Sequence, residues 1–193
     1  MKKQEELSKY QHKILTIPNI LSFARLCMIP LFIWLYCVRK NYPLTGAVLL
    51  LSGATDLADG FIARHFHMIS DLGKVLDPVA DKLTQAAVLF CLVTRFPLML
   101  APLVLMVFKE GYMAVAGAMA IRKTGKVAGA QWHGKIVTAL LYAMMIVHIF
   151  WYDIPAVVSN LLIAACILMM IASVVLYGKY YGKILKKAKG KKK

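Results

Sequence analysis

Five aspartates lie within 26 residues of an otherwise apolar part of the chain, and four of them form two pairs. Asp56 and Asp59 are three residues apart, and Asp77 and Asp81 are four apart, so on helices each pair shares one face. Carboxylate oxygens without clustered cysteine or histidine are the ligands that hard divalent cations prefer. The spacing therefore predicts a site for two Mg²⁺ or Mn²⁺ ions, whose charges would balance the four carboxylates.

Aspartates within a membrane need something to neutralise them. Each charged residue in a span costs about 2.5–3.5 kcal/mol on insertion scales, so four cost on the order of 10 kcal/mol. A structural alternative would pair Asp59 with Arg64 and Asp81 with its neighbour Lys82. Two basic partners do not balance four converging carboxylates, so metal binding is the favoured interpretation.

Small residues accompany both aspartate pairs. Gly60 and Ala63 continue the face of the first pair, and Gly73 lies one helical turn before the second. A small side chain lets a bulky ligand approach the backbone. Arg64, at the end of the same helix as Ala63, offers paired donors to a phosphate. A metal that polarises phosphoryl oxygens, together with these residues, indicates a substrate that contains a diphosphate.

The chain that must position these residues is apolar and basic. Of its 193 residues 60% are hydrophobic, and the mean hydropathy is +0.65, which is typical of membrane proteins. The formal net charge of +15 suits anionic lipid headgroups. The basic residues lack the interleaved aromatic residues of a nucleic-acid surface, so no nucleic-acid partner is expected.

We expect an all-α integral membrane protein built as a bundle of six transmembrane helices. The apolar runs predict spans at about Ile20–Val38, Pro43–Ala63, Leu76–Val93, Leu98–Ile121, Ile136–Trp151 and Ala156–Tyr177. The six-helix domain is expected over residues 19–181. An amphipathic segment on the membrane surface is expected over residues 1–18. A basic tail is expected over residues 182–193, its last eight residues forming a disordered tether to anionic lipid.

Basic residues predict the orientation of these spans. They gather in the N-terminal segment, in the loops after the second and fourth spans, and in the tail, while the other side has only Arg39, Lys40 and Arg95. Both termini and the aspartates are therefore predicted to face the cytoplasm, in a multi-pass protein of a bacterial-type inner membrane.

The four cysteines (Cys27, Cys37, Cys91 and Cys166) lie in apolar runs and are expected to be small buried residues.

The chain resembles the CDP-alcohol phosphatidyltransferases, whose signature it matches in full. The signature reads D-x-x-D-G-x-x-A-R over residues 56–64, then eight residues, then G-x-x-x-D-x-x-x-D over residues 73–81, and it fixes eight positions. The start of the first span, with Ile17, Pro18, Asn19, Arg25 and Pro30, is also similar to small bacterial members of that family.

The resemblance implies an enzyme that transfers phosphatidyl from CDP-diacylglycerol to an alcohol and releases CMP. It implies that Asp56, Asp59, Asp77 and Asp81 ligate the metal ions, and that Asp81 is the general base that deprotonates the acceptor. The nucleotide and diphosphate would be held by Asn19, Asp56, Gly60, Ala63, Arg64 and Gly73. A homodimer is also implied. Asp71 lies outside the signature and is expected to be a solvated or capping residue.

The acceptor is expected to contact the second half of the chain, at Lys109, Glu110, Arg122 and Lys135. Phosphatidylglycerophosphate synthases, the closest in overall resemblance, take glycerol 3-phosphate, and they carry an arginine and a lysine where this chain has Gly117 and Val137. A phosphomonoester carries nearly two negative charges and needs a cationic pocket. Cardiolipin synthases of the same family resemble this chain in lacking that arginine and often that lysine, so phosphatidylglycerol is favoured over glycerol 3-phosphate. Inositol phosphate, serine or another alcohol stays open.

Two other classes of protein compete with an enzyme. An ion-coupled transporter is the remote alternative, because intramembrane acids can form an ion path. A transporter of that kind shows repeats or broken helices in corresponding positions, whereas here Glu110 is the only acid in an expected span outside the 26-residue block. A catalytically inactive scaffold would have lost a metal ligand, and none is lost.

The histidines are expected to be surface or core residues, with His133 beside Gly134 and Lys135 the one to check.

Overall fold

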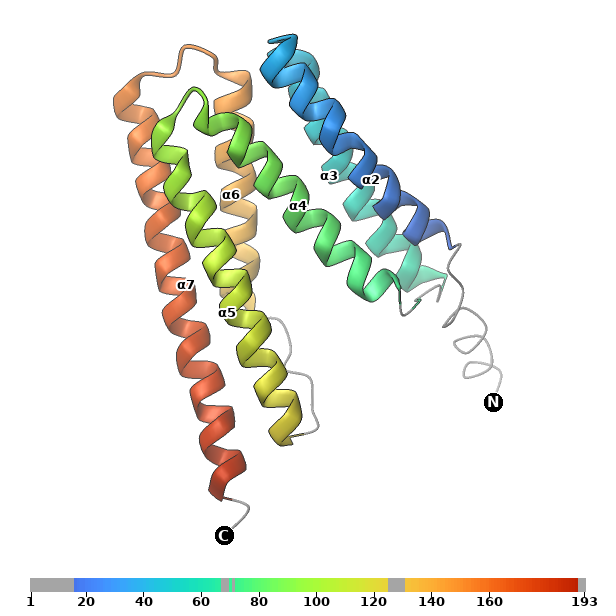
Figure 1. The fold of residues 1–193 in the computed structure, drawn as a ribbon, viewed down its shortest axis with the longest axis vertical. Coiled ribbons are helices and arrows are strands. Elements are labelled where there is room, and N and C mark those ends of the chain that lie inside the picture. The colour runs from blue at the N-terminus through green and yellow to red at the C-terminus, as the bar shows by residue number, and fades with distance from the viewer. Residues whose placement is uncertain (1–15, 67–69, 71, 125–130, 191–193) are drawn as a thin grey trace. The chain divides into compact units, whose positions relative to one another are not determined.

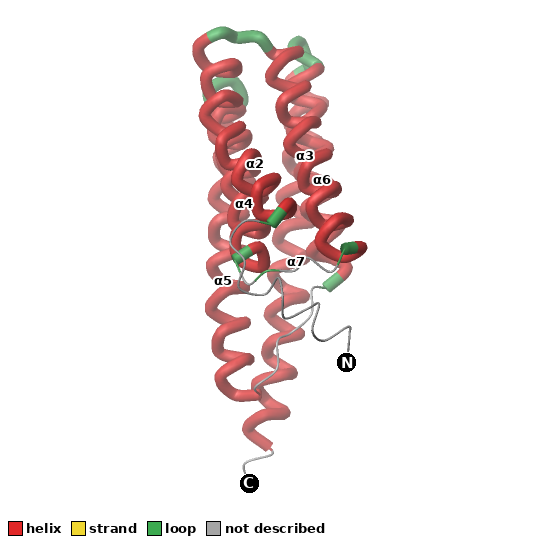
Figure 2. Tube along the Cα trace, turned by 90° about the vertical axis from the view of Figure 1, so that its right-hand side faces the viewer, coloured by secondary structure: helices red, strands yellow, loops and turns green. Residues whose placement is uncertain are grey.

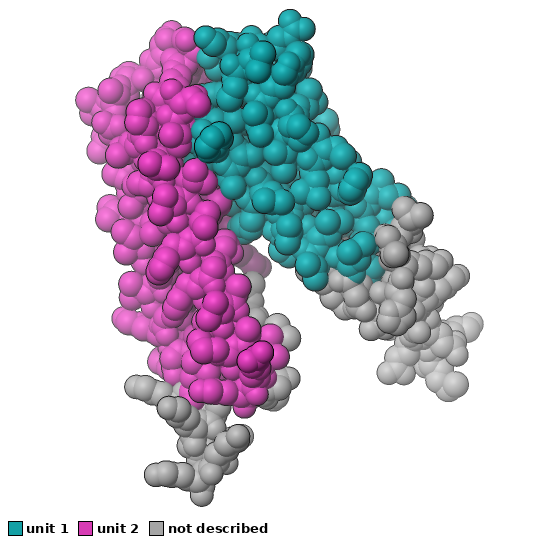
Figure 3. Space-filling view, in the orientation of Figure 1, with its two compact units in different colours: residues 1–91 teal, residues 92–193 magenta. Residues whose placement is uncertain are grey.

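The computed structural model describes residues 16–66, 70, 72–124 and 131–190, and every element among them is helical (Figure 1). The all-α prediction is therefore confirmed for these residues. The chain divides into two compact units, unit 1 (residues 1–91) and unit 2 (residues 92–193), which Figure 3 distinguishes by colour. Residues 1–15 of the predicted amphipathic segment lie outside the described residues.

Unit 1 is built from three long helices. Its elements are α2 (Ile17–Ile33), which continues as the π-helical turn η1 (Trp34–Val38), then α3 (Tyr42–His65) and most of α4 (Gly73–Val93). α2 and α3 pack against each other. The interior of unit 1 is apolar around η1, with Phe32, Leu35, Tyr36, Leu49 and Leu89. Toward the start of α2 it becomes polar, with Ser22, Arg25 and Asp59 buried.

Local sequence determines where α2 and α3 begin. Thr16 Oγ1 accepts a hydrogen bond from the backbone N–H of Asn19 at 3.4 Å, and Asn41 Oδ1 accepts one from that of Leu44 at 3.1 Å. Each helix also has a proline in its first turn, where the missing N–H leaves no helical hydrogen bond unmade. The start of α2 at Ile17 is thereby fixed two residues before Asn19 and five before Ser22, which are both buried polar residues of the candidate site.

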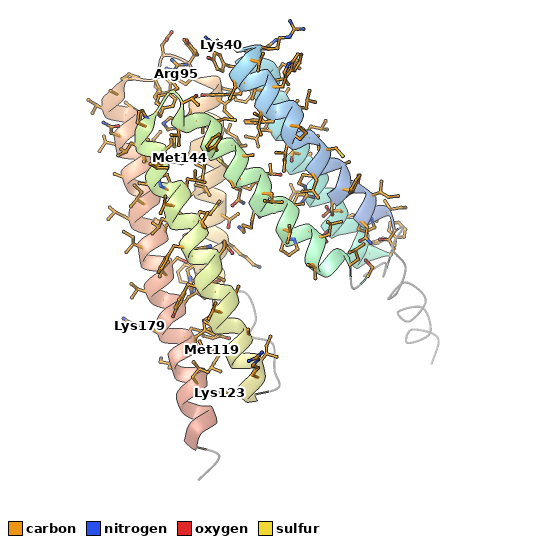
Figure 4. The ribbon with its side chains drawn as sticks, viewed as in Figure 1. Lys40, Arg95, Met119, Lys123, Met144 and Lys179 are labelled. Carbon is orange, nitrogen blue, oxygen red and sulfur yellow. The ribbon has the colours of Figure 1, made fainter. Side chains whose placement is uncertain are left out.

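Unit 2 is also built from three long helices, which Figure 2 shows from the side. Its elements are the 3₁₀ turn η2 (Pro97–Met99), α5 (Leu100–Thr124), α6 (Trp132–Phe150) and α7 (Ala156–Gly190). α7 packs against both α5 and α6. Figure 4 shows Arg95 at one end of unit 2, and Lys123 and Lys179 toward the other.

Five of the helical segments are long and apolar enough to cross a membrane. They are Ile17–Val38, Tyr42–Ile62, Pro97–Lys123, Trp132–Phe150 and Ala156–Leu185. The remaining predicted span forms α4, a helix of 21 residues, but Asp77, Asp81 and Lys82 lower its hydropathy. The described residues are therefore all-helical with five candidate membrane spans, as expected of a membrane protein, whereas the sixth span and the orientation of the termini stay predictions.

The structure corrects two expectations. Residues 186–190 were expected in a disordered tether, but they are helical and continue α7, because lysine and alanine favour a helix that is already formed. Cys27 and Cys37 were expected to be buried, and both are exposed, since they lie on the outward side of their helical segments. The same expectation is confirmed for Cys91 and Cys166, which are buried.

Candidate functional site

Arg25 joins the first aspartate pair to α2. Its side chain is only 1% exposed, and its Nη1 lies 2.7 Å from Asp56 Oδ1 on α3. Its Nη2 donates a hydrogen bond to Asp59 Oδ2, and Asp59 is itself 3% exposed. Arg25 thus contacts both members of the first pair with one planar group, as a guanidinium is suited to do. Its Nε has no hydrogen-bond partner among the described residues.

Ser22 joins the two aspartate pairs. Its hydroxyl is within hydrogen-bonding distance of Asp77 Oδ1 on α4 and lies 3.3 Å from Asp59 Oδ2 on α3. The carbonyl of Pro18 is a third acceptor at 3.1 Å, so these oxygens compete for one hydroxyl proton. Side chains on three helices therefore converge, and residues from both halves of the signature lie at one place in unit 1.

Asp81 has a separate set of neighbours on its own helix. Gln85 Nε2 lies 3.1 Å from each of the two carboxylate oxygens, and Gln85 is buried. Lys82 Nζ lies 3.3 Å from Asp81 Oδ2, so the ion pair expected in the structural alternative is present. Asp81 also lies one helical turn after Asp77 on α4, so the two aspartates of the second pair share a face of that helix.

A hydrogen-bonded contact holds the start of α4 against the start of α2. The Ser70 hydroxyl donates to Asn19 Oδ1 at 2.9 Å, and the backbone N–H of Gly73 donates to Ser70 Oγ at 3.0 Å. A Cβ atom at residue 73 would lie 2.6 Å from Asn19 Oδ1, so any larger residue would displace Asn19. Gly73 is therefore required for packing, a reason that the sequence did not reveal.

The remaining signature residues are on α3. Gly60 lies one position after Asp59 in the helix and is half-buried. Ala63 and Arg64 belong to the last turns of α3, and their side chains are outside what the structure describes. Asp71 also lies outside the described residues. The expected alternative partner of Asp59 was Arg64, and the partner that the structure shows is Arg25.

The donor atoms fit a hard divalent cation in chemistry. Four carboxylates and one hydroxyl supply only oxygen ligands, which Mg²⁺ and Mn²⁺ prefer over softer ions. Within the described part of the chain, no group of three or more histidine, cysteine, aspartate or glutamate side chains is arranged closely enough to hold a metal ion. Arg25 instead supplies positive charge to Asp56 and Asp59. An ion that bound these two carboxylates would therefore compete with the guanidinium.

The residues expected to contact the acceptor are all in unit 2, and the structure separates them into two kinds. Lys109 is buried on α5, with its Nζ 2.7 Å from Glu110 Oε1. Arg122 and Lys135 are exposed, and Arg122 lies in the last turn of α5, where a cation favours the helix dipole. The structure therefore brings Lys109 and Glu110 together as an ion pair, whereas Arg122 and Lys135 lie at exposed positions of α5 and α6.

His133 lies buried on α6. Its Nδ1 is 3.2 Å from Ser173 Oγ, and its ring packs edge-on against Tyr177 with ring centres 4.4 Å apart. The expectation of a surface or core histidine is confirmed for His133, and also for His148, which is buried 2.9 Å from Ser159 Oγ.

A cluster of tyrosines on α7 lies beside Gly117. Tyr177 stacks on Tyr181, and Tyr180 packs edge-on against Tyr181. A Cβ atom at Gly117 would lie 3.5 Å from the Tyr181 hydroxyl, and Val137 is buried. The three- and four-residue spacing of these tyrosines is the signal that could have predicted a shared helical face.

Comparisons with known proteins agree with the signature. A sequence profile described as CDP-alcohol phosphatidyltransferase matches residues 15–179. The cardiolipin synthase (CMP-forming) of Streptomyces coelicolor is 49% identical over 77 residues, which are 37% of this chain and 35% of that protein. The CDP-diacylglycerol–glycerol-3-phosphate 3-phosphatidyltransferase of Bacillus subtilis is 33% identical over 136 residues, 63% of this chain and 70% of that protein.

A third relative is the human cardiolipin synthase (CMP-forming), which is 36% identical over 108 residues. That match covers 55% of this chain and 35% of the human protein. The chain therefore spans about a third of the two cardiolipin synthases, at 35% each, and 70% of the Bacillus protein.

Proposed function

Since the chain belongs to the CDP-alcohol phosphatidyltransferase family, we propose that it transfers a phosphatidyl group from CDP-diacylglycerol to an alcohol and releases CMP. One observation carries this proposal. Asp56, Asp59 and Asp77 converge from α3 and α4 around Ser22 and Arg25 of α2. Three aspartates of the signature therefore lie together in the folded chain, which supports the proposal.

The four signature aspartates would hold two Mg²⁺ or Mn²⁺ ions. A bound ion of this kind polarises the phosphoryl oxygens of a diphosphate. The oxygen-only donor set supports this assignment, and the buried guanidinium of Arg25 shows that the cluster accommodates positive charge. The nucleotide and diphosphate would be held by Asp56 together with Asn19, Gly60, Ala63, Arg64 and Gly73.

Asp81 is proposed as the general base. It would take the proton of the acceptor hydroxyl while the hydroxyl oxygen attacks the phosphorus beside diacylglycerol, and the bond from that phosphorus to the CMP oxygen would break. Gln85 Nε2 contacts both Asp81 oxygens, which fixes the rotation of the carboxylate. Such orientation is what a base must have before proton transfer.

Phosphatidylglycerol is the acceptor that we favour, which would make the product cardiolipin. Its phosphodiester carries one charge, so it needs fewer cations than a phosphomonoester. In unit 2 Gly117 faces the Tyr181 hydroxyl and Val137 is buried, so neither position offers a cation. Lys109, Glu110, Arg122 and Lys135 would be the residues that contact the acceptor.

Glycerol 3-phosphate is the second candidate acceptor. The Bacillus relative is covered over 70% of its length, and its name states glycerol 3-phosphate as the acceptor. Lys109 is a buried cation in unit 2, and Arg122 and Lys135 are exposed cations there, so a phosphomonoester would find some positive charge.

We place the protein in a bacterial-type inner membrane with the aspartates and both termini toward the cytoplasm. The distribution of basic residues supports this orientation. α4 would be the sixth span, with its aspartates neutralised at the site. The homodimer that the family resemblance implies is to be tested by the mass of the purified protein in detergent.

The decisive experiment gives the purified full chain radiolabelled CDP-diacylglycerol with Mg²⁺ and one acceptor at a time. Phosphatidylglycerol should yield CMP and cardiolipin, while glycerol 3-phosphate should yield little product. Rapid turnover of glycerol 3-phosphate without use of phosphatidylglycerol would assign the second candidate. No CMP release with any alcohol, from protein that is folded and binds CDP-diacylglycerol, would contradict the transferase proposal.

A further inference from the structure

Two cysteines that are far apart in the sequence meet in unit 1. Cys37 Sγ lies 3.7 Å from Cys91 Sγ, although 54 residues separate them. Cys37 belongs to the π-helical turn η1, which continues α2, and Cys91 lies near the end of α4. A disulfide needs sulfur atoms about 2 Å apart, so rotation of the side chains has to close the remaining distance.

The two thiols differ in access. Cys37 is exposed, whereas Cys91 is buried with none of its surface accessible. Arg39 and Lys40 follow Cys37 within one turn, and the Arg39 guanidinium lies 4.8 Å from the centre of the Trp34 ring. Tryptophan and basic residues are typical of the boundary between lipid and water. A reagent dissolved in water can therefore reach Cys37 first.

We propose that Cys37 and Cys91 are a site of reversible disulfide formation by exchange with a small or protein disulfide. The Cys37 thiolate attacks one sulfur of the oxidant, and a thiolate leaves, which gives a mixed disulfide at Cys37. Cys91 then loses its proton, and its sulfur attacks Cys37 Sγ and expels the second thiolate. Two electrons pass to the oxidant, and the two protons of the cysteines go to the two thiolates that leave.

The disulfide would tie together two helices of the candidate site. α2 carries Ser22 and Arg25, and α4 carries Asp77 and Asp81. Cys37 lies 12 residues after Arg25, and Cys91 lies 10 residues after Asp81. At a helical rise of about 1.5 Å per residue, the bond would form roughly 15–18 Å from those site residues. Oxidation would therefore restrain the separation of α2 and α4 without touching the carboxylates.

The test uses the reduced, detergent-purified full chain, treated with oxidised glutathione. Free thiols are then blocked with N-ethylmaleimide, and proteolytic peptides are identified by mass spectrometry before and after dithiothreitol. We expect a linked Cys37–Cys91 peptide, a fall from four free thiols to two, and full reversal by dithiothreitol. Cys27→Ser, which removes another exposed thiol from α2, should leave this result unchanged.

Cys37→Ser and Cys91→Ser should each abolish the linked peptide. The oxidised wild-type chain should also unfold several degrees higher than the reduced chain, since the bond closes a long loop in the unfolded state. Glutathione that stays on Cys37 while Cys91 remains a thiol would overturn the proposal. So would a Cys37–Cys37 bond between two chains, or four thiols that resist oxidation in protein whose helical circular dichroism is intact.

Discussion

Both units bury charged side chains between apolar helices, but the partners of their ion pairs are separated by very different numbers of residues. In unit 1 Arg25 pairs with Asp56 and Asp59, which lie 31 and 34 residues away. In unit 2 the buried Lys109 pairs with Glu110, the next residue. The first arrangement exists only when α2 and α3 are packed, whereas the second exists in α5 alone. The fold holds the carboxylates of Asp56 and Asp59 in place whichever cation neutralises them. A metal ion could therefore take the place of the Arg25 guanidinium beside them.

Glycine also has a different partner in each unit. In unit 1 Gly73 gives room to the amide of Asn19 beside the carboxylates. In unit 2 Gly117 and Gly178 face the hydroxyl groups of Tyr181 and Tyr112, at 3.5 Å and 3.3 Å from a Cβ atom placed there. The close contact of unit 1 positions an amide, and those of unit 2 pack aromatic side chains. On the proposed function, unit 1 would carry the chemistry and unit 2 would select the acceptor.

The largest effect should come from removing divalent cations. We expect transfer to be lost in EDTA and restored by Mg²⁺ or Mn²⁺, with Zn²⁺ a poor substitute because the site lacks thiolate and imidazole ligands. CMP release measures the effect. Full turnover in a preparation shown by elemental analysis to be free of metal would contradict a catalytic metal site in unit 1.

Asp77→Asn should lower CMP release by about 100-fold or more, because losing one aligned electrostatic group in a catalytic site has effects of that size. The protein should still insert into membranes, since the change removes a charge from α4. Asp153→Asn is the matched control, because Asp153 is 89% exposed and belongs to unit 2. Near-normal turnover of Asp77→Asn at low Mg²⁺ would refute the two-metal assignment.

Arg25→Met should test whether a metal ion can replace the guanidinium beside Asp56 and Asp59. Without metal it leaves Asp56 and Asp59 without this partner, and removing one member of a buried pair typically costs about 3–5 kcal/mol. Thermal unfolding in EDTA should show the loss, and Mg²⁺ should raise the melting temperature of the variant more than that of the wild type.

Lys109→Met is the comparison for Arg25→Met. Glu110 is 31% exposed and can be hydrated, so we expect a smaller loss of stability and no enhanced response to Mg²⁺. Equal Mg²⁺ responses in Arg25→Met, Lys109→Met and the wild type would show that the ion does not bind where the guanidinium lies.

The smallest effect concerns the acceptor. Gly117→Arg combined with Val137→Lys should raise the use of glycerol 3-phosphate, since each hydrogen bond to a charged group contributes about 1.5–3 kcal/mol. Strain against Tyr181 should reduce the gain, to roughly tenfold in kcat/KM, equivalent to about 1.4 kcal/mol. The Tyr181→Ala background tests this strain, because it removes the hydroxyl that faces residue 117. No gain in either background would show that these positions do not select the acceptor.

Local patterns in the sequence predicted the helices and the four aspartates, and the family is confirmed. The spacing of Asp56, Asp59, Asp77 and Asp81 is visible within single helices, so periodicity alone places each pair on a face. The contacts of Arg25 and Ser22 were not predictable in this way. Their partners lie on other helices, and no local pattern states which helix packs against which.

Other misses have the same physical origin. The contact of Gly73 with Asn19 was not predictable, because Asn19 is 54 residues away and the packing between them is tertiary. The meeting of Cys37 and Cys91 also depends on two separate elements. The continuation of α7 has a different explanation. A lysine-rich composition is typical of disorder, but a helix that is already formed can extend through such residues.

The length of α7 has a mechanical consequence. Its 35 residues span about 52 Å at a rise of about 1.5 Å each, whereas the hydrocarbon core of a bilayer is about 30 Å thick. In a bilayer, part of this helix must project as a rod unless it is steeply tilted. Lys179 and Lys183 are both exposed and lie one turn apart, so they share a face of the rod. The rigid helix therefore holds both positive charges at a fixed distance from the membrane and on one side of α7.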